Sequence, residues 1–147
     1  MVKMPRALAV AFAMLTACSN SASPAPKGWE PVPGAGGAWS NGSGSNAQQY
    51  VYQKNAFGGA LPDLASQVTI NVLLQHHGAK LQGSQPFGPC PAAAGLATFA
   101  LPAHKTLQVG FAARDDQAVR VNYIRPAGAL IDSNVTEAMQ RVLCTLQ

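Results

Sequence analysis

Apolar and polar residues alternate along two neighbouring segments late in the chain, residues 106–113 and 118–125. Alternation with a period of two is typical of β-strands that have one buried face. The short polar stretch between them, residues 114–117, predicts an antiparallel hairpin. Its apolar positions are Leu107, Val109 and Phe111 in the first strand and Val119, Val121 and Tyr123 in the second.

The register of this hairpin follows from the assumption that both apolar sets point to the same side of the sheet. That assumption pairs Val109 with Val121, because a slip of one residue would turn one set outward. The loop then contains an odd number of residues, most simply residues 114–116, with an aspartate tolerating positive φ. Arg120 and Asn122 lie on the other face, which we expect to be solvated or only partly covered.

Three further strands and two helices are predicted from the same patterns, which gives an α+β fold with a largely antiparallel sheet and two main helices. The strands are expected over residues 48–54, 80–85 and 96–101, with a loop that presents Cys90 over residues 86–91. The first helix is expected over residues 61–77, ending before Gly78, and its apolar stripe is Leu61, Leu64, Ala65, Val68 and Val72. The second helix closes the chain, with Asp132, Ser133 or Asn134 as its cap and an apolar stripe of Val135, Ala138, Met139, Val142, Leu143 and Leu146.

The chain has 147 residues, of which 48% are apolar and 11% charged, as suits a single domain with an ordinary core. Its formal net charge of +4 falls once Lys3 and Arg6 are assigned to a removable leader, because eight basic residues then face six acidic ones. A net charge of about +2 leaves no basic stripe, so a nucleic-acid partner is not expected.

Residues 1–17 have the pattern expected of a cleaved signal peptide. Lys3 and Arg6 form a basic start, and an apolar run over residues 7–15 follows. This run is too short to span a bilayer as a helix, so a cleaved signal is favoured over a transmembrane anchor.

The residues that close this run, Leu15, Thr16, Ala17 and Cys18, resemble the lipobox of bacterial lipoproteins. The resemblance implies cleavage before Cys18 and acylation of its sulfur, for example with palmitate. It implies a lipid-anchored protein of the bacterial cell envelope, at the outer membrane or the cell surface. The alternative is an ordinary secretory signal, cut after Ala17 or Ala22, that leaves an incidental cysteine.

Residues 18–38 are rich in proline, glycine and serine and are interpreted as a tether, with a single domain over residues 39–147. A flexible chain of about 20 residues has a reach on the order of 25 Å, enough to hold a domain clear of lipid head groups. Trp29 and Trp39 are costly to leave in water, so we expect them to pack onto the domain, Trp39 at its start.

The three cysteines are accounted for together. If Cys18 carries lipid, Cys90 and Cys144 remain as a pair in an oxidising compartment, where a disulfide is the expected state. Closing a loop of this length gives a stabilisation of at most about 4 kcal/mol. The bond would fasten the last helix to the loop before the central strand.

No catalytic, metal-binding or cofactor-binding residue is predicted. His76 and His77 are neighbours on a helix and point in different directions, so they cannot readily chelate one metal, and His104 has no motif that brings it near them. Asp115 and Asp116 are explained by a solvated turn. The chain is therefore not expected to be an enzyme, and no cofactor is expected.

The order of elements is similar to that of the PsbP and Mog1-type α/β/α sandwich, and Gly59, Leu61, Asp63 and Leu64 at the first helix start add to the resemblance. It covers residues 39–147 and implies a largely antiparallel sheet with helices on its faces. Members of this family act mainly as assembly or binding modules, and they share no catalytic motif that could be carried over.

The function expected from these features is that of a lipid-anchored binding or assembly module of the cell envelope. It would act on an envelope protein partner or a ligand through an exposed sheet face or loop. One alternative is an envelope hydrolase or metal-dependent enzyme that uses His104 or His76 in a pocket. Another is a passive surface antigen or spacer.

Overall fold

The structure is a computed structural model that describes residues 23–145. The elements of this part are β1 (Glu30–Pro31), β2 (Ala38–Asn41), the short 3-10 helix η1 (Gly44–Asn46), β3 (Gln48–Ala56), α2 (Leu61–Gln75), β4 (Lys80–Pro86), β5 (Ala94–Leu101), β6 (Lys105–Arg114), β7 (Gln117–Pro126) and α3 (Ser133–Cys144). The strands form one antiparallel sheet in the order β1-β2-β3-β7-β6-β5-β4. The α+β class, with a largely antiparallel sheet and two main helices, is therefore confirmed.

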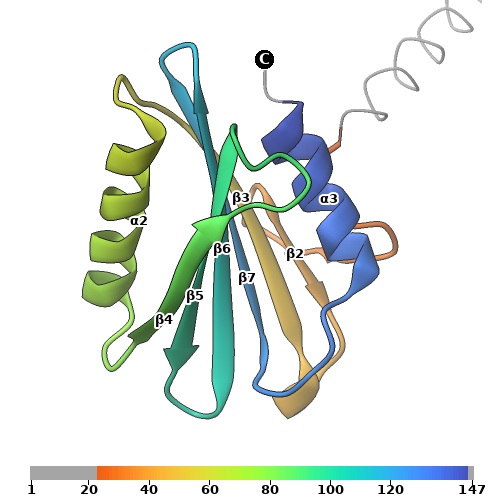
Figure 1. Cartoon of the computed structure of the whole chain (residues 1–147). Coiled ribbons are helices and arrows are strands. Elements are labelled where there is room, and N and C mark those ends of the chain that lie inside the picture. Colours follow the sequence, from red (N-terminus) through yellow and green to blue (C-terminus); the bar gives the residue numbers. More distant parts are fainter. Residues whose placement is uncertain (1–22, 146–147) are drawn as a thin grey trace, which may run out of the picture.

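The two helices lie on opposite faces of the sheet (Figure 1). Helix α2 packs mainly on β5 and β6, and α3 packs on β6 and β7. Each helix covers its own hydrophobic core, so the described part of the chain has three layers: helix, sheet and helix.

Helix α2 forms where its local sequence predicts it. Pro62 occupies the first turn, and the Asp63 carboxylate accepts a hydrogen bond from the Ala60 backbone N–H at 3.1 Å. Leu64, Val68 and Val72 recur every four residues and are buried against the sheet. The helix ends two residues before the predicted limit of residue 77.

Helix α3 is capped by Asp132, one of the three predicted candidates. The Asp132 carboxylate accepts a hydrogen bond from the Asn134 backbone N–H at 2.8 Å. The helix packs closely on β6 at Gly110, where a Cβ atom would lie 2.7 Å from Leu143 Cδ1. A side chain at this position would therefore force the buried Leu143 side chain to shift.

The register of the β6–β7 hairpin differs from the prediction. Arg114 pairs with Gln117, which leaves Asp115 and Asp116 as a two-residue turn, and Val109 pairs with Asn122 instead of Val121. Both aspartates have positive φ, 54° and 61°, as a type I′ turn requires. The predicted odd loop of residues 114–116 is wrong.

This register sends the two apolar sets of the hairpin to opposite faces of the sheet. Leu107, Val109 and Phe111 belong to the core under α2, whereas Val119, Val121 and Tyr123 belong to the core under α3. The prediction failed because it assumed one buried face. With a helix on each face, both apolar sets are buried, so the observed register exposes neither set to water.

The domain begins earlier than the predicted boundary at residue 39. Trp29 is only 7% exposed and makes edge contacts with the rings of Tyr50 and Tyr123. Its Nε1–H donates a hydrogen bond to the Asp132 carboxylate at 3.1 Å, and β1 and β2 extend the sheet beyond β3. Residues 26–38 therefore belong to the domain, and the predicted tether is too long. The signal peptide and Cys18 lie outside the described residues.

The turn geometry predicts the effect of replacing Asp115 by glycine. Glycine adopts positive φ without the steric cost that an L-residue bears, so Asp115→Gly should stabilise the fold by about 0.5–1 kcal/mol. Chemical denaturation measures the change. Ala92→Gly is the control, because Ala92 lies in an exposed loop and does not have positive φ. This variant should be destabilised by about as much as Asp115→Gly is stabilised. Equal losses in the two variants would contradict the two-residue turn.

Candidate ligand-binding site

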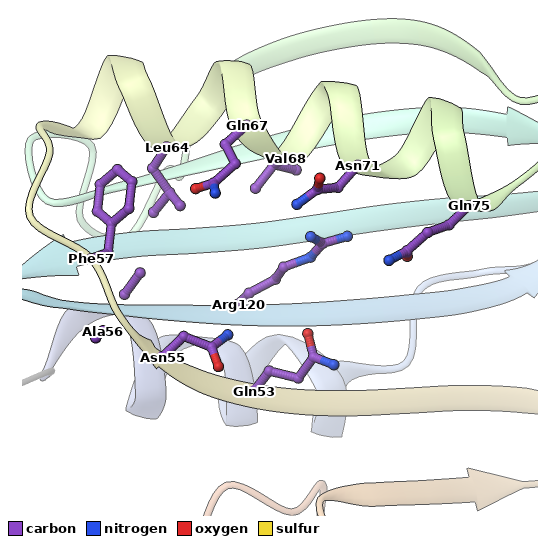
Figure 2. A pocket seen from close by; sticks show the side chains of 11 residues that line it. Gln53, Asn55, Ala56, Phe57, Leu64, Gln67, Val68, Asn71, Gln75 and Arg120 are labelled. Atoms are coloured by element: carbon purple, nitrogen blue, oxygen red, sulfur yellow. The ribbon is translucent and has the colours of Figure 1, made fainter.

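A polar pocket of about 270 Å³ lies between α2 and the neighbouring strands β3 and β7, with Arg120 of β7 in it (Figure 2). The pocket opens beside the core that α2 buries against β5 and β6. It is lined by Gln53, Asn55, Ala56, Phe57, Leu64, Gln67, Val68, Asn71, Gln75, Ala118 and Arg120.

The polar wall on the helix side arises from the spacing of three carboxamides. Gln67, Asn71 and Gln75 are four residues apart, so they form one stripe along α2. This stripe lies next to the apolar stripe that anchors the helix. The helix therefore turns a row of amides toward the pocket while its apolar side rests on the sheet.

The opposite wall comes from the sheet. Gln53 of β3 is paired with Arg120 of β7, and Asn55 is paired with Ala118, so all four lie on the same face of two neighbouring strands. Figure 2 shows the Arg120 side chain between helix and sheet, with Asn71 on the helix side and Gln53 on the strand side.

Arg120 is the only charged residue that lines the pocket. Its Nε–H donates a hydrogen bond to Asn122 Oδ1 at 3.1 Å, and Nη1 and Nη2 donate none within the described part of the chain. Burial lowers the pKa of Arg120 below its ordinary value, but a guanidinium remains charged at neutral pH. The pocket thus holds a half-buried positive charge without a lining carboxylate to balance it.

These groups are suited to binding. The guanidinium offers fixed donors to an anion, and each carboxamide offers both donors and an acceptor. The lining residues include no histidine, cysteine, serine or carboxylate that could act as nucleophile or general base.

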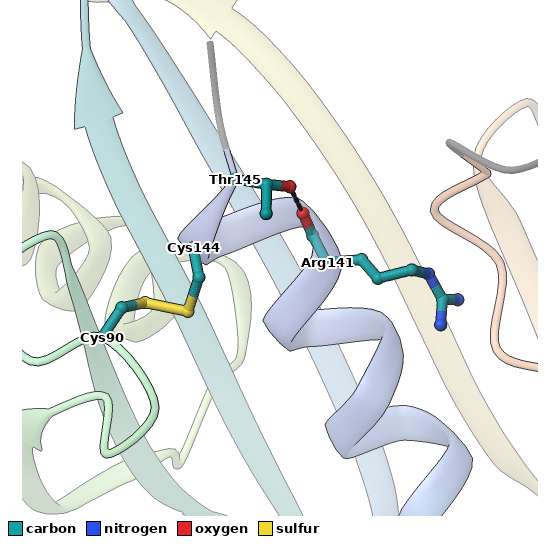
Figure 3. The surroundings of a disulfide bond; sticks show 4 residues. All are labelled: Cys90, Arg141, Cys144 and Thr145. Atoms are coloured by element: carbon teal, nitrogen blue, oxygen red, sulfur yellow. Dashed lines mark hydrogen bonds between the residues drawn. A yellow bond between two sulfur atoms is a disulfide. The ribbon is translucent and has the colours of Figure 1, made fainter.

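The two cysteines predicted to pair form a disulfide in the structure (Figure 3). Their Cα atoms are 5.6 Å apart, and 54 residues separate them along the chain. The bond joins the loop between β4 and β5 to the last residue of α3. Beside it, the Thr145 hydroxyl donates a hydrogen bond to the Arg141 carbonyl.

The histidines considered in the sequence lie outside the pocket. His76 follows the end of α2, His77 is exposed, and His104 is exposed in the loop between β5 and β6. Over residues 23–145, no three of the histidine, cysteine, aspartate and glutamate side chains come together as a metal site would require. Asp115 and Asp116 are exposed at the hairpin turn.

The sequence prediction missed the pocket. It noted Arg120 only as a polar residue on a strand of apolar ones, and it did not consider the amides of α2. The available signal was the four-residue spacing of Gln67, Asn71 and Gln75 beside a buried stripe. That signal gives the helix face but not the strand that it meets.

Comparisons of the sequence with protein-family models and with curated proteins gave no match. Neither of the helices found within residues 23–145 has the length and apolar character needed to cross a membrane. Function is therefore inferred from the pocket and from the sequence features described above.

The disulfide predicts that the fold is sensitive to reductant. Reduction should lower the free energy of unfolding by about 3–4 kcal/mol, because the open loop restores chain entropy to the unfolded state. Denaturation with and without dithiothreitol measures the loss. The double variant Cys90→Ala/Cys144→Ala should show the same loss and no response to reductant. Two free thiols at these positions in the intact mass of the purified chain would refute the pairing.

Proposed function

We propose that this protein is a lipid-anchored binding module of the bacterial cell envelope, which holds its ligand in the pocket beside α2. The observation that carries the binding role is the half-buried guanidinium of Arg120, faced by carboxamides and by no acid. A charge that is half removed from water and has no counter-ion is stabilised when a ligand supplies the opposite charge.

Two features support the cellular location. The motif that ends at Cys18 resembles a lipobox, which implies a lipid anchor. The Cys90–Cys144 pair fits an exported protein, because disulfides persist in oxidising compartments and are rare in the cytosol.

We also propose that the domain is related to the PsbP and Mog1-type sandwich. The support is the placement of one helix on each face of a largely antiparallel sheet. A binding or assembly role agrees with what that resemblance implies. The alternative of a histidine-based enzyme is disfavoured by the position of His76 and His104 away from the pocket lining.

The anchor predicts that fatty-acid labelling depends on one cysteine. Cells that produce the wild-type chain and are fed radiolabelled palmitate should yield a labelled protein in the membrane fraction. The Cys18→Ser variant should be unlabelled and should leave that fraction.

The matched control is the double variant Cys90→Ser/Cys144→Ser, which keeps Cys18 and should keep the label. Label on Cys18→Ser would remove the anchor from the proposal. Affinity capture from membranes with the wild-type chain and Cys18→Ser then tests whether a partner is held only by the anchored form.

A further inference from the structure

The charge of the pocket restricts the charge of its ligand. Arg120 supplies one positive charge, and each of the other ten lining residues is uncharged. A carboxylate carries one negative charge and is neutralised by one guanidinium. A phosphate monoester carries about −1.5 to −2 at pH 7 and would leave uncompensated charge at a partly buried site.

The hydrogen bond within the protein restricts the geometry of binding. Arg120 Nε–H is already donated to Asn122 Oδ1, which orients the guanidinium and leaves its far edge, Nη1 and Nη2, for a ligand. Two parallel N–H groups at this edge match the two oxygens of a carboxylate. Asn122 thus acts as a positioning residue for Arg120.

The carboxamides indicate what else the ligand carries. Five of them line the pocket, from both the helix and β3: Gln53, Asn55, Gln67, Asn71 and Gln75. Hydroxyl and amide groups pair well with such side chains, because both partners can donate and accept. A purely hydrocarbon ligand would leave these amides without partners as it displaced water.

The size of the pocket indicates how much of a ligand it can enclose. A volume of about 270 Å³ lies just below the usual range of sites for drug-sized molecules, about 300–1,000 Å³. The pocket therefore suits one sugar acid or one acylated amino acid.

From these constraints we propose that the pocket binds a small monocarboxylate that also carries hydroxyl or amide groups, with Arg120 holding the carboxylate end-on. This inference rests on the proposed binding function and specifies the ligand of that same site.

Isothermal titration calorimetry on the full chain tests the ligand class with matched probes. D-glucuronate and N-acetyl-L-alanine carry both required features, acetate carries only the carboxylate, glucose carries only the hydroxyls, and glucose 6-phosphate replaces the carboxylate by a phosphate. We expect glucuronate or N-acetylalanine to bind at least about tenfold more tightly than acetate, glucose and glucose 6-phosphate.

Three variants locate the binding. Arg120→Gln should weaken the best probe about tenfold or more, and Arg120→Lys should recover only part of the loss, because an ammonium lacks the planar fork. Arg125→Gln is the control: it removes the same charge from the same strand, and Arg125 bonds to Gln108 outside the pocket. It should bind like the wild type.

The Arg120 Nε–H signal in an NMR spectrum of the full chain gives a second readout that does not require a variant to fold. It should shift on addition of glucuronate or N-acetylalanine and stay unchanged with glucose. Binding that leaves this signal unmoved, or that survives Arg120→Gln, would overturn the assignment of the site.

The remaining outcomes separate this inference from the proposed function. Tighter binding of glucose 6-phosphate, lost in Arg120→Gln, would overturn the carboxylate class and leave a binding module in place. Binding of none of the probes would overturn the inference, whereas a wild-type chain that takes up no palmitate would overturn the anchor alone.

Discussion

The pairing of Arg114 with Gln117 across a two-residue turn determines the layout of the domain. This register places Val109 opposite Asn122, so the apolar positions of β6 and β7 point to opposite faces of the sheet. Each face then needs a helix to exclude water, and α2 and α3 meet that need. The same register puts Arg120 on the face of α2, where it becomes the charge of the pocket.

The two main helices and strands β3 to β7 could be predicted because their signals are local, whereas β1 and β2 were not predicted. The Asp132 cap of α3 and the alternation of β6 and β7 each lie within a few residues of the structure that they specify. The register could not be predicted in this way. Whether Val109 and Val121 share a face depends on how many faces are covered, which is set by helices that lie far away in the sequence.

The disulfide and the pocket also differ in how far the sequence could predict them. The Cys90–Cys144 pair could be inferred without any geometry, because removing one cysteine of three leaves a single pairing. The pocket, by contrast, could be recognised only from the three-dimensional arrangement of the elements. The sequence around Asn71 does not distinguish it from other polar residues on a helix. It lines the pocket because α2 lies beside the strand that carries Arg120. Contacts of that kind come from the topology and not from a motif.

The start of the described chain bears on how an anchored domain would sit at a membrane. Trp29 donates to Asp132, and Arg141 of α3 donates to the Ala25 carbonyl, so this segment is fixed to the α3 side of the sheet. If Cys18 carries lipid, the five residue steps to Ser23 span at most about 18 Å. The domain would then be held within a shorter distance of the lipid than the reach of about 25 Å that a tether ending at residue 38 would give. The Arg120 pocket, beside α2 on the other face, would be on the side away from the anchored segment and accessible to a ligand.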